Sequence, residues 1–321
     1  MNYKIKDDLR ASLGIDCREV TPVEGGWLNK KWKAETDRGT LLIKQYSHKR
    51  FSLAGIDQIE AALFRQMKLA EDGLPCPRIF TIDGHPIRRL NDDIAYMVME
   101  FCPGVTGDVG SVTEKQLVTL GHVTAQMKRG FAAMDPVGAK DYPMDCGARY
   151  AELLDNYRRH TDRLTDDAPE EYRRALSAQE KILQWLSPAY FAGLAKGLAH
   201  EDFSPDNMLF DATGVTAILD FDRCRYGFVL HDIGRILMSL AFSDGVLDVS
   251  RIRAFMAGYR ELMPLTDADI ADALRVTWCV EVMWWIQPGL WRDPKPKLRR
   301  FRDELCWLTE NFTRLDAWNH I

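Results

Sequence analysis

The sequence predicts an α+β protein built from two lobes, a small one that holds an antiparallel sheet and a larger one that is mainly helical. Short apolar runs separated by turn residues dominate residues 1–101, which is typical of strands. After Cys102-Pro-Gly104 the apolar residues recur at helical spacing instead. With 321 residues the chain is long enough for one large bilobal unit, so we expect lobes over residues 1–101 and 102–321.

In the small lobe, Trp32–Thr36 and Thr40–Tyr46 are expected to pair as strands through the turn Asp37-Arg38-Gly39. The segment Ile56–Glu71 has its apolar residues on one side at helical spacing. Gly73-Leu-Pro-Cys-Pro77 ends that helix because proline cannot continue it. Further strands are expected at Arg78–Ile82 and Ala95–Phe101.

The large lobe is expected to contain seven helices and one polar hairpin. Two of the helices begin at good capping residues, Thr113 and Thr266. Between Leu198 and Cys224 two short apolar runs are separated by Asp211-Ala-Thr-Gly214, which indicates a hairpin. The predicted helices cover Thr113–Phe131, Ala148–Thr161, Pro169–Leu186, Leu230–Phe242, Ser250–Met263, Asp267–Ile286 and Lys297–Asp316.

Composition and charge limit the class of protein. Hydrophobic residues make up 46% of the chain and charged residues 28%, the balance of a soluble globular protein. The formal net charge of −5 argues against nucleic acid as a partner, because binding a phosphate backbone usually needs a basic surface. The most apolar late stretch, Val276–Trp291, is interrupted by Glu281 and Pro288, so we expect no membrane span.

The seven cysteines and the start of the chain both favour a cytoplasmic protein. No two cysteines form a Cys-x-x-Cys motif, their number is odd and their spacings are wide, which suits reduced thiols better than disulfides or a zinc site. Four of the first eight residues are charged, and the segment contains no apolar signal core. The oligomeric state is left open.

The polar hairpin contains the residues that phosphoryl transfer needs. Such a reaction uses a carboxylate that orients the attacking hydroxyl and accepts its proton, and oxygen ligands that hold Mg²⁺ against the phosphates. Asp202 fits the first role, and Asn207 and Asp220 fit the second. A hairpin between Asn207 and Asp220 would bring these two side chains together.

The string His200-Glu-Asp202-x-x-x-x-Asn207, followed by Ile218-Leu-Asp220-Phe, resembles the signature of the aminoglycoside phosphotransferase and choline kinase superfamily and, more distantly, of the protein kinases. This resemblance implies a bilobal protein kinase-like fold, ATP and Mg²⁺ as cofactors, and a small-molecule hydroxyl as acceptor. Glu201 departs from the pattern, because these small-molecule kinases commonly have glycine there; we do not expect it to disable the loop.

Asp and Asn are common in loops, so an isolated Asp-x-x-x-x-Asn would mean little; the full ordered string is much more specific. The resemblance implies that His200 braces the loop. Asp222 is either a second metal ligand or a structural neighbour. Asp232 resembles a family aspartate that supports the catalytic loop, and its alternative is a simple helix cap.

The small lobe supplies the other parts that the resemblance implies. Lys44 ends an apolar run as the family's strand lysine does and would contact the α- and β-phosphates, held by Glu60 of the next helix. The alternative is a surface lysine and a solvated glutamate. Gly25 and Gly26 resemble the glycine-rich phosphate loop, although two glycines often mean only a tight turn.

Met97-Val-Met-Glu100-Phe-Cys102 resembles the hinge strand whose main-chain groups bind the edge of adenine. These groups would belong to residues from Glu100 to Cys102. The resemblance becomes faint after about residue 245. A further departure is Met127-Lys128, where relatives often have leucine and histidine, and it affects a supporting contact.

The acceptor is not determined by the sequence. Four tryptophans could cage a quaternary ammonium, but Trp278 and Trp285 are seven residues apart on a predicted helix, which favours core packing. Acidic residues could attract a polyamine, yet several lie at predicted helix starts, where they stabilise the dipole. These residues are Trp278, Trp284, Trp285, Trp291, Asp244, Asp248, Asp267, Asp269, Asp272 and Glu281.

We therefore expect an ATP-dependent phosphotransferase that acts on a hydroxyl of an aminoglycoside, an amino alcohol, a sugar or homoserine. Two alternatives remain. A protein Ser/Thr kinase is disfavoured because no activation segment ending in an Ala-Pro-Glu-like motif follows Asp220. A nucleotide-binding pseudoenzyme is disfavoured because Lys44, Asp202, Asn207 and Asp220 are all present.

Overall fold

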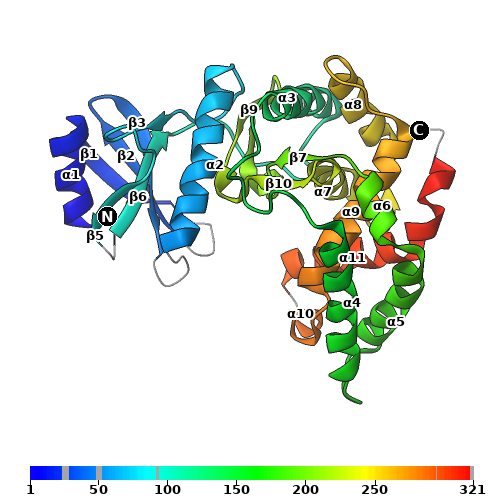
Figure 1. Ribbon diagram of the computed structural model, residues 1–321. Helices are drawn as coiled ribbons and strands as arrows, with labels where there is room; N and C mark the ends of the chain where they lie inside the picture. Colours follow the sequence, from blue (N-terminus) through cyan, green and yellow to red (C-terminus); the bar gives the residue numbers. More distant parts are fainter. Residues whose placement is uncertain (24–28, 48–52, 92–93, 294, 319–321) are drawn as a thin grey trace.

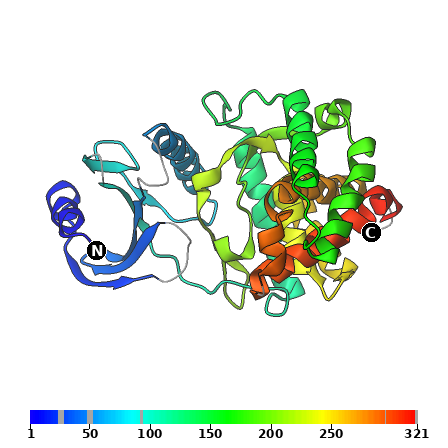
Figure 2. The same ribbon diagram turned by 90° about the horizontal axis from the view of Figure 1, so that it is seen from below.

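The computed structural model describes residues 1–23, 29–47, 53–91, 94–293 and 295–318 (Figure 1). A six-stranded antiparallel sheet forms the N-terminal part, and helices dominate the rest. The two parts lie side by side in an elongated molecule, with helix α2 (Leu53–Glu71) at their junction (Figures 1 and 2). The predicted α+β kinase-like architecture is confirmed.

The sheet has the strand order β1-β2-β3-β6-β4, and β5 also pairs with β6. The predicted hairpin of β2 and β3 is confirmed, with Thr36 opposite Gly39 and Trp32 opposite Ile43. Gly39 has φ 96°, a conformation that favours glycine in this tight turn. The strands are β1 Cys17–Pro22, β2 Lys30–Thr36, β3 Gly39–Tyr46, β4 Ile79–Phe80, β5 Arg88–Asn91 and β6 Ile94–Glu100.

One face of this sheet packs on helix α1 (Tyr3–Leu13), which the sequence analysis missed. Only Ile5 and Leu9 of α1 are buried, so its apolar stripe is too short to be recognised by periodicity. Its ends do have local signals: the Asn2 side chain accepts a hydrogen bond from the Lys4 N–H (3.0 Å), and Gly14 ends the helix with φ 63°.

The other face of the sheet packs on helix α2 (Leu53–Glu71) through Ile59 and Leu63. The predicted helix is confirmed. Two other residues of α2, Ala62 and Leu69, belong to the main core of the helical part. The same helix therefore packs on the sheet and on the helical core, and links the two.

All seven predicted helices of the C-terminal part are present, with their ends shifted by a few residues. They are α3 Glu114–Ala132, α4 Cys146–Asp162, α5 Glu170–Trp185, α7 Leu230–Ala241, α8 Val249–Arg260, α9 Asp267–Trp285 and α11 Pro296–Asn311. Two short helices, α6 Pro188–Gly193 and α10 Pro288–Arg292, were not predicted. None of the helices in the described ranges is long and apolar enough to cross a membrane.

The polar hairpin is confirmed as β8 (Met208–Phe210) paired with β9 (Val215–Ile218). The non-helical segment is longer than predicted. It is flanked by β7 (Lys196–Ala199) and β10 (Arg225–Phe228), which pair with each other and close the segment into a loop. A tiny sheet of β11 (Phe242–Ser243) and β12 (Val246–Leu247) follows α7.

Helix α7 is fixed close to α9 at a glycine. A Cβ atom on Gly234 would lie 2.1 Å from the Ala273 carbonyl oxygen, so a larger residue would push the two helices apart. This contact is two residues from Asp232 and holds the first turn of α7 beneath the loop that follows β7.

Candidate active site

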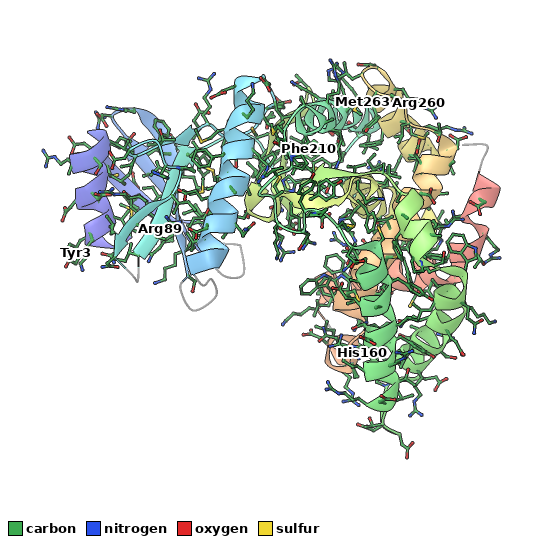
Figure 3. All side chains as sticks on the ribbon, viewed as in Figure 1. Tyr3, Arg89, His160, Phe210, Arg260 and Met263 are labelled. Atoms are coloured by element: carbon green, nitrogen blue, oxygen red, sulfur yellow. The ribbon has the colours of Figure 1, made fainter. Side chains whose placement is uncertain are left out.

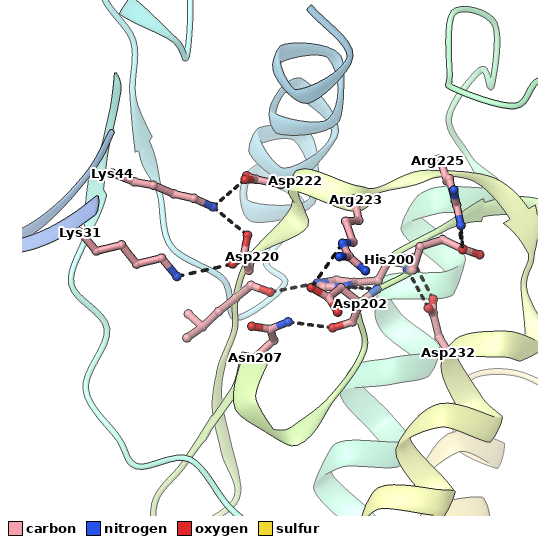
Figure 4. A network of polar contacts seen from close by, with 12 residues as sticks. Lys31, Lys44, His200, Asp202, Asn207, Asp220, Asp222, Arg223, Arg225 and Asp232 are labelled. Atoms are coloured by element: carbon pink, nitrogen blue, oxygen red, sulfur yellow. Dashed lines mark hydrogen bonds and ion pairs between the residues drawn. The ribbon is translucent and has the colours of Figure 1, made fainter. Parts of the chain in front are cut away.

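The loop between β7 and β8 brings together the residues that the sequence analysis placed at the centre of the site (Figure 4). It runs from His200 to Asn207 and ends in a 3₁₀ turn, Pro205–Asn207. At the end of β9, the Leu219 N–H donates to the Asn207 carbonyl oxygen (2.8 Å). Asp220 follows directly, so the hairpin closes the sequence gap between Asn207 and Asp220 as predicted.

Asp202 presents a partly exposed carboxylate, with 39% of its side chain accessible. Its carbonyl oxygen accepts a hydrogen bond from Asn207 Nδ2 (2.8 Å), which fixes the position of the loop around it. The Arg223 Nε lies 3.9 Å from the Asp202 carboxylate, and the Arg223 side chain is half exposed. A carboxylate that is fixed through its backbone and open at its oxygens is suited to accept a proton from a bound hydroxyl.

His200 is fully buried and links the loop to the end of β9. Its Nε2 is 2.9 Å from the Leu219 carbonyl oxygen, and its Nδ1 accepts a hydrogen bond from the Asp202 N–H (3.3 Å). Nε2 must donate to a carbonyl, so the ring is the neutral Nε2–H tautomer. With both nitrogens engaged, His200 is placed to brace the loop.

Asp232 lies under the same loop, completely buried. Its two carboxylate oxygens accept hydrogen bonds from the His200 and Glu201 N–H groups, each at 2.9 Å. Lys128 of α3 pairs with it. Burial opposes ionisation, but Lys128 and the other groups around the carboxylate together hold the pKa of Asp232 below its ordinary value.

The alternative of a helix cap does not describe Asp232, because the cap position of α7 is Val229 and makes no side-chain cap bond. Lys128 was noted in the sequence as a departure from the family pattern, and its partner could not be inferred. The structure identifies that partner as Asp232.

Replacing Lys128 by Met is expected to destabilise the protein by about 3–5 kcal/mol, because it leaves the Asp232 carboxylate buried without its cation. The measurement is denaturant unfolding of the variant against the wild type. Lys115→Met, at an exposed position of the same helix, is the control and should change stability by less than about 0.5 kcal/mol. Equal stability of the two variants would contradict the importance assigned to this pair.

Glu201 is the residue that replaces the family glycine, and its backbone has φ 63°. Its buried side chain accepts hydrogen bonds from Arg225 Nη2 (2.7 Å) and Nε (3.1 Å) and lies 3.7 Å from His231 Nδ1. Burial would raise the pKa of Glu201, but His231 and Arg225 together lower it well below its ordinary value. These contacts offset the strain of a left-handed backbone at a residue with a Cβ.

Lys44 extends from β3 into the space between the sheet and the loop, where it contacts two carboxylates. Its Nζ lies 2.7 Å from Asp220 and 2.7 Å from Asp222, and only 2% of the side chain is exposed. Burial would lower the pKa of Lys44, but the two carboxylates raise it above its ordinary value. Lys44 is therefore a fixed cation at this site.

The carboxylates of this cluster titrate differently. Burial would raise the pKa of Asp220, but Lys44 and Lys31 lower it well below its ordinary value. Burial raises the pKa of Asp222, and the attraction of Lys44 does not cancel this effect. Asp220 is therefore the carboxylate that stays ionised most readily.

The predicted pair of Lys44 and Glu60 is not formed, which corrects the sequence-based expectation. Glu60 instead contacts Arg89 Nη2 (3.3 Å) and His85 Nδ1 (3.2 Å). Figure 3 shows Arg89 on the sheet, on the side of α2 away from the helical part. Glu60 points toward this arginine rather than toward the loop, and the carboxylate that fixes Lys44 together with Asp220 is Asp222.

Asp222 also accepts a hydrogen bond from the Tyr46 hydroxyl (3.1 Å), and 12% of its side chain is exposed. Of the two alternatives left open by the sequence, these contacts favour a structural neighbour that positions Lys44. Tyr46 was not predicted in this role, although its place two residues after Lys44 on the same face of β3 is a usable signal.

Gly25 and Gly26 lie outside the described residues. The hinge segment is described, and it follows β6. The Glu100 N–H donates to the Arg78 carbonyl oxygen (3.0 Å) and the Phe101 N–H to the Thr40 carbonyl oxygen (3.1 Å). Because these amides are engaged in holding the sheet, Cys102 is the next main-chain donor along the hinge.

The residues expected to hold Mg²⁺ have suitable chemistry. Asn207 uses its amide nitrogen on Asp202, and its amide oxygen is turned the other way, on the side of Asp220 (Figure 4). Asp220 has φ 60° and ψ 60°, and its carboxylate is directed toward Lys31 and Lys44. One amide oxygen and one ionised carboxylate are hard oxygen ligands of the kind that magnesium prefers alongside phosphate oxygens. Within the described ranges, no cluster of three or more His, Cys, Asp or Glu side chains forms a separate metal site.

The aromatic and acidic residues considered for acceptor binding are mostly structural. Trp278 is fully buried and donates from Nε1 to Thr309 (2.8 Å), whereas Trp284 is 58% exposed. Each acidic residue except Asp244 has a local partner or cap: Asp248 and Asp269 cap α8 and α9, Asp267 pairs with Arg260, Asp272 with Arg275, and Glu281 with Arg235.

The fold combines a small antiparallel sheet, a hinge and a helical part. Its site brings two aspartates and an asparagine together around a buried lysine. This combination defines a kinase-like phosphotransferase. The profile of the phosphotransferase enzyme family matches residues 19–265. The chain belongs to this family. The predicted family and class of enzyme are confirmed.

Among curated relatives, the chain is 28% identical over 273 residues to the homoserine kinase of Gluconacetobacter diazotrophicus, covering 81% of this chain and 78% of the relative. It is 26% identical over 267 residues to that of Methylobacillus flagellatus, covering 80% and 76%. These similarities extend through most of both chains.

Among solved structures, the chain is similar to an amicoumacin kinase in complex with AMP-PNP, Ca²⁺ and Ami (TM-score 0.64, 15% identity, 99% of this chain and 96% of the other). It is also similar to a spectinomycin phosphotransferase bound to ADP and spectinomycin (TM-score 0.63, 15% identity, 98% of both). At this identity the similarity establishes the fold.

Proposed function

We propose that this protein transfers the γ-phosphate of ATP to the hydroxyl of homoserine or of a similar small molecule that has both an amino and a carboxylate group. The observation that carries the proposal is the pairing of the open Asp202 carboxylate with the half-exposed Arg223 guanidinium at the same edge of the site. The similarity to homoserine kinases over most of the chain supports it.

In this proposal Asp202 orients the acceptor hydroxyl and accepts its proton as the phosphoryl group moves. Lys44 neutralises charge on the nucleotide phosphates, held in place by Asp220 and Asp222. Asn207 and Asp220 would hold Mg²⁺, which when bound would screen the charge of the phosphates. Most of the rate acceleration then comes from positioning and electrostatics.

The two lobes would have different roles in this reaction. Residues 1–101 would form the nucleotide-binding lobe and residues 102–321 the catalytic and acceptor-binding lobe. The main chain from Glu100 to Cys102 would bind the adenine edge, and Gly25 and Gly26 would approach the phosphates.

All seven cysteines are free thiols in the structure, which supports a cytoplasmic location.

Arg223 determines which acceptors we expect. A guanidinium binds a carboxylate through two parallel hydrogen bonds, and it repels an acceptor whose nearest group is an ammonium. A small hydroxy amino acid can place its hydroxyl at Asp202 and its carboxylate at Arg223. A polycationic aminoglycoside has no carboxylate to place at Arg223.

The test is the rate of ADP release with Mg-ATP across homoserine, an aminopropanol, a fructosamine and an aminoglycoside. We expect the highest kcat/KM with homoserine. Arg223→Gln should raise the KM for homoserine about tenfold or more, while activity toward the aminopropanol, which has no carboxylate, changes little. A higher kcat/KM with the aminopropanol than with homoserine would refute the assignment of the acceptor.

A further inference from the structure

A second lysine shares the site with Lys44. Lys31 of β2 lies directly opposite Lys44 of β3 in the antiparallel register, so both side chains leave the same face of the sheet. Both point at the end of β9, where the Lys31 Nζ is 3.5 Å from one carboxylate oxygen of Asp220 and the Lys44 Nζ is 2.7 Å from the other (Figure 4).

The two lysines differ in how firmly they are held. Lys44 is almost fully buried, with two carboxylates at 2.7 Å. Among the described residues, Lys31 has an ion pair with Asp220 alone, at the long end of the hydrogen-bond range, and 20% of its side chain is exposed. Lys31 can therefore change partner without leaving a buried charge unpaired, whereas Lys44 cannot.

A bound nucleoside triphosphate changes the charge balance at this place. The four side chains Lys31, Lys44, Asp220 and Asp222 are together neutral. A triphosphate adds more negative charge than one divalent cation neutralises, and Asp220, if it held that cation together with Asn207, would be less available to Lys31. The group left without a partner and next to the added negative charge is the ammonium of Lys31.

We propose that Lys31 is a second nucleotide-binding cation, which contacts a β- or γ-phosphate oxygen of ATP beside Asp220. The inference deepens the proposed function, since it rests on ATP being the phosphoryl donor, but it does not depend on the identity of the acceptor. It assigns to β2 a role in distinguishing the triphosphate from shorter nucleotides.

The neighbouring lysines of β2 show that position and not composition gives Lys31 this role. Lys33 is on the same face, but it pairs with Glu35 (3.0 Å) and its Nζ lies 5.3 Å from the ring centroid of Phe101 at the hinge. Lys30 is exposed and points to the opposite face, because side chains alternate along a strand. Lys30 is therefore a matched control on the same strand.

The experiment is calorimetric binding of Mg-ATP, Mg-ADP and AMP, without any acceptor, to the wild type, Lys31→Met, Lys31→Arg and Lys30→Met. For Lys31→Met we expect Kd for Mg-ATP to rise roughly tenfold, with a smaller rise for Mg-ADP and none for AMP. Lys31→Arg should keep most of the affinity, and Lys30→Met should match the wild type.

Wild-type affinity of Lys31→Met for Mg-ATP would overturn the proposal and leave Lys31 as a counterion of Asp220. An equal loss for all three nucleotides would also overturn it, since that would place the effect away from the terminal phosphates. Lys31→Gln, with thermal unfolding of each variant, gives the same comparison if Lys31→Met does not fold. Failure of the acceptor assignment would leave these binding results unchanged.

Discussion

Asp202→Asn is expected to slow phosphoryl transfer by roughly 10²–10⁴-fold while Mg-ATP binds as it does to the wild type. The amide keeps the size of the carboxylate but cannot accept the proton of the acceptor hydroxyl. The loop should keep its shape, because its contacts with Asn207 and His200 use the backbone of Asp202 and not its side chain. The measurements are turnover under saturating substrates and calorimetric nucleotide binding.

The matched control for this variant is Asp206→Asn, an exposed position in the same loop, which should keep turnover within about twofold of the wild type. Wild-type turnover in Asp202→Asn would remove Asp202 from its assigned role. Loss of nucleotide binding in that variant would mean that the change disturbs the whole site.

Asp220→Asn is expected to weaken Mg-ATP binding about tenfold or more and to abolish most turnover. Asn tolerates the left-handed backbone that Asp220 adopts, so the substitution changes the charge and not the conformation. It removes an ionised oxygen ligand and leaves Lys44 with Asp222 alone. The measurement is nucleotide affinity as a function of Mg²⁺ concentration.

The variant Asp222→Asn distinguishes the role of the Asp222 carboxylate from that of the Asp220 carboxylate. If Asp222 positions Lys44, this variant should lose activity but keep the Mg²⁺ dependence of nucleotide binding. An unchanged Mg²⁺ dependence in Asp220→Asn, or a changed one in Asp222→Asn, would exchange the roles given to these residues.

The ordered string from His200 to Asp220 could be predicted because its geometry is local. The loop and the hairpin are set by neighbouring residues, and the Leu219 to Asn207 hydrogen bond follows from the pairing of β8 and β9. The long helices could be predicted for the same reason, since their apolar periodicity extends over several turns. Helix α1 has only two buried residues and gave too little signal.

Partner choice among charged residues could not be predicted, because it depends on which side chains converge in three dimensions. Glu60 has the right position on its helix, yet Arg89 lies on the side toward which it points. Lys128 and Asp232 are far apart in the sequence and meet only through the packing of α3 against the loop.

Lys31 is a residue that the sequence could have indicated. The turn at Gly39 fixes the register of β2 and β3, and counting back from Thr36 opposite Gly39 places Lys31 opposite Lys44. If the two strands are predicted correctly, that register also places both lysines on the same face of the sheet, next to Asp220.

Transfer of a phosphoryl group from ATP to a hydroxyl can be observed by ³¹P NMR of a reaction with Mg-ATP and homoserine. We expect the γ-phosphate signal to disappear as ADP and a phosphomonoester appear in equal amounts. Phosphoryl transfer to a hydroxyl would be ruled out if inorganic phosphate were the only new product. It would also be ruled out if a sample that binds nucleotide left ATP unchanged with homoserine, the aminopropanol, the fructosamine and the aminoglycoside.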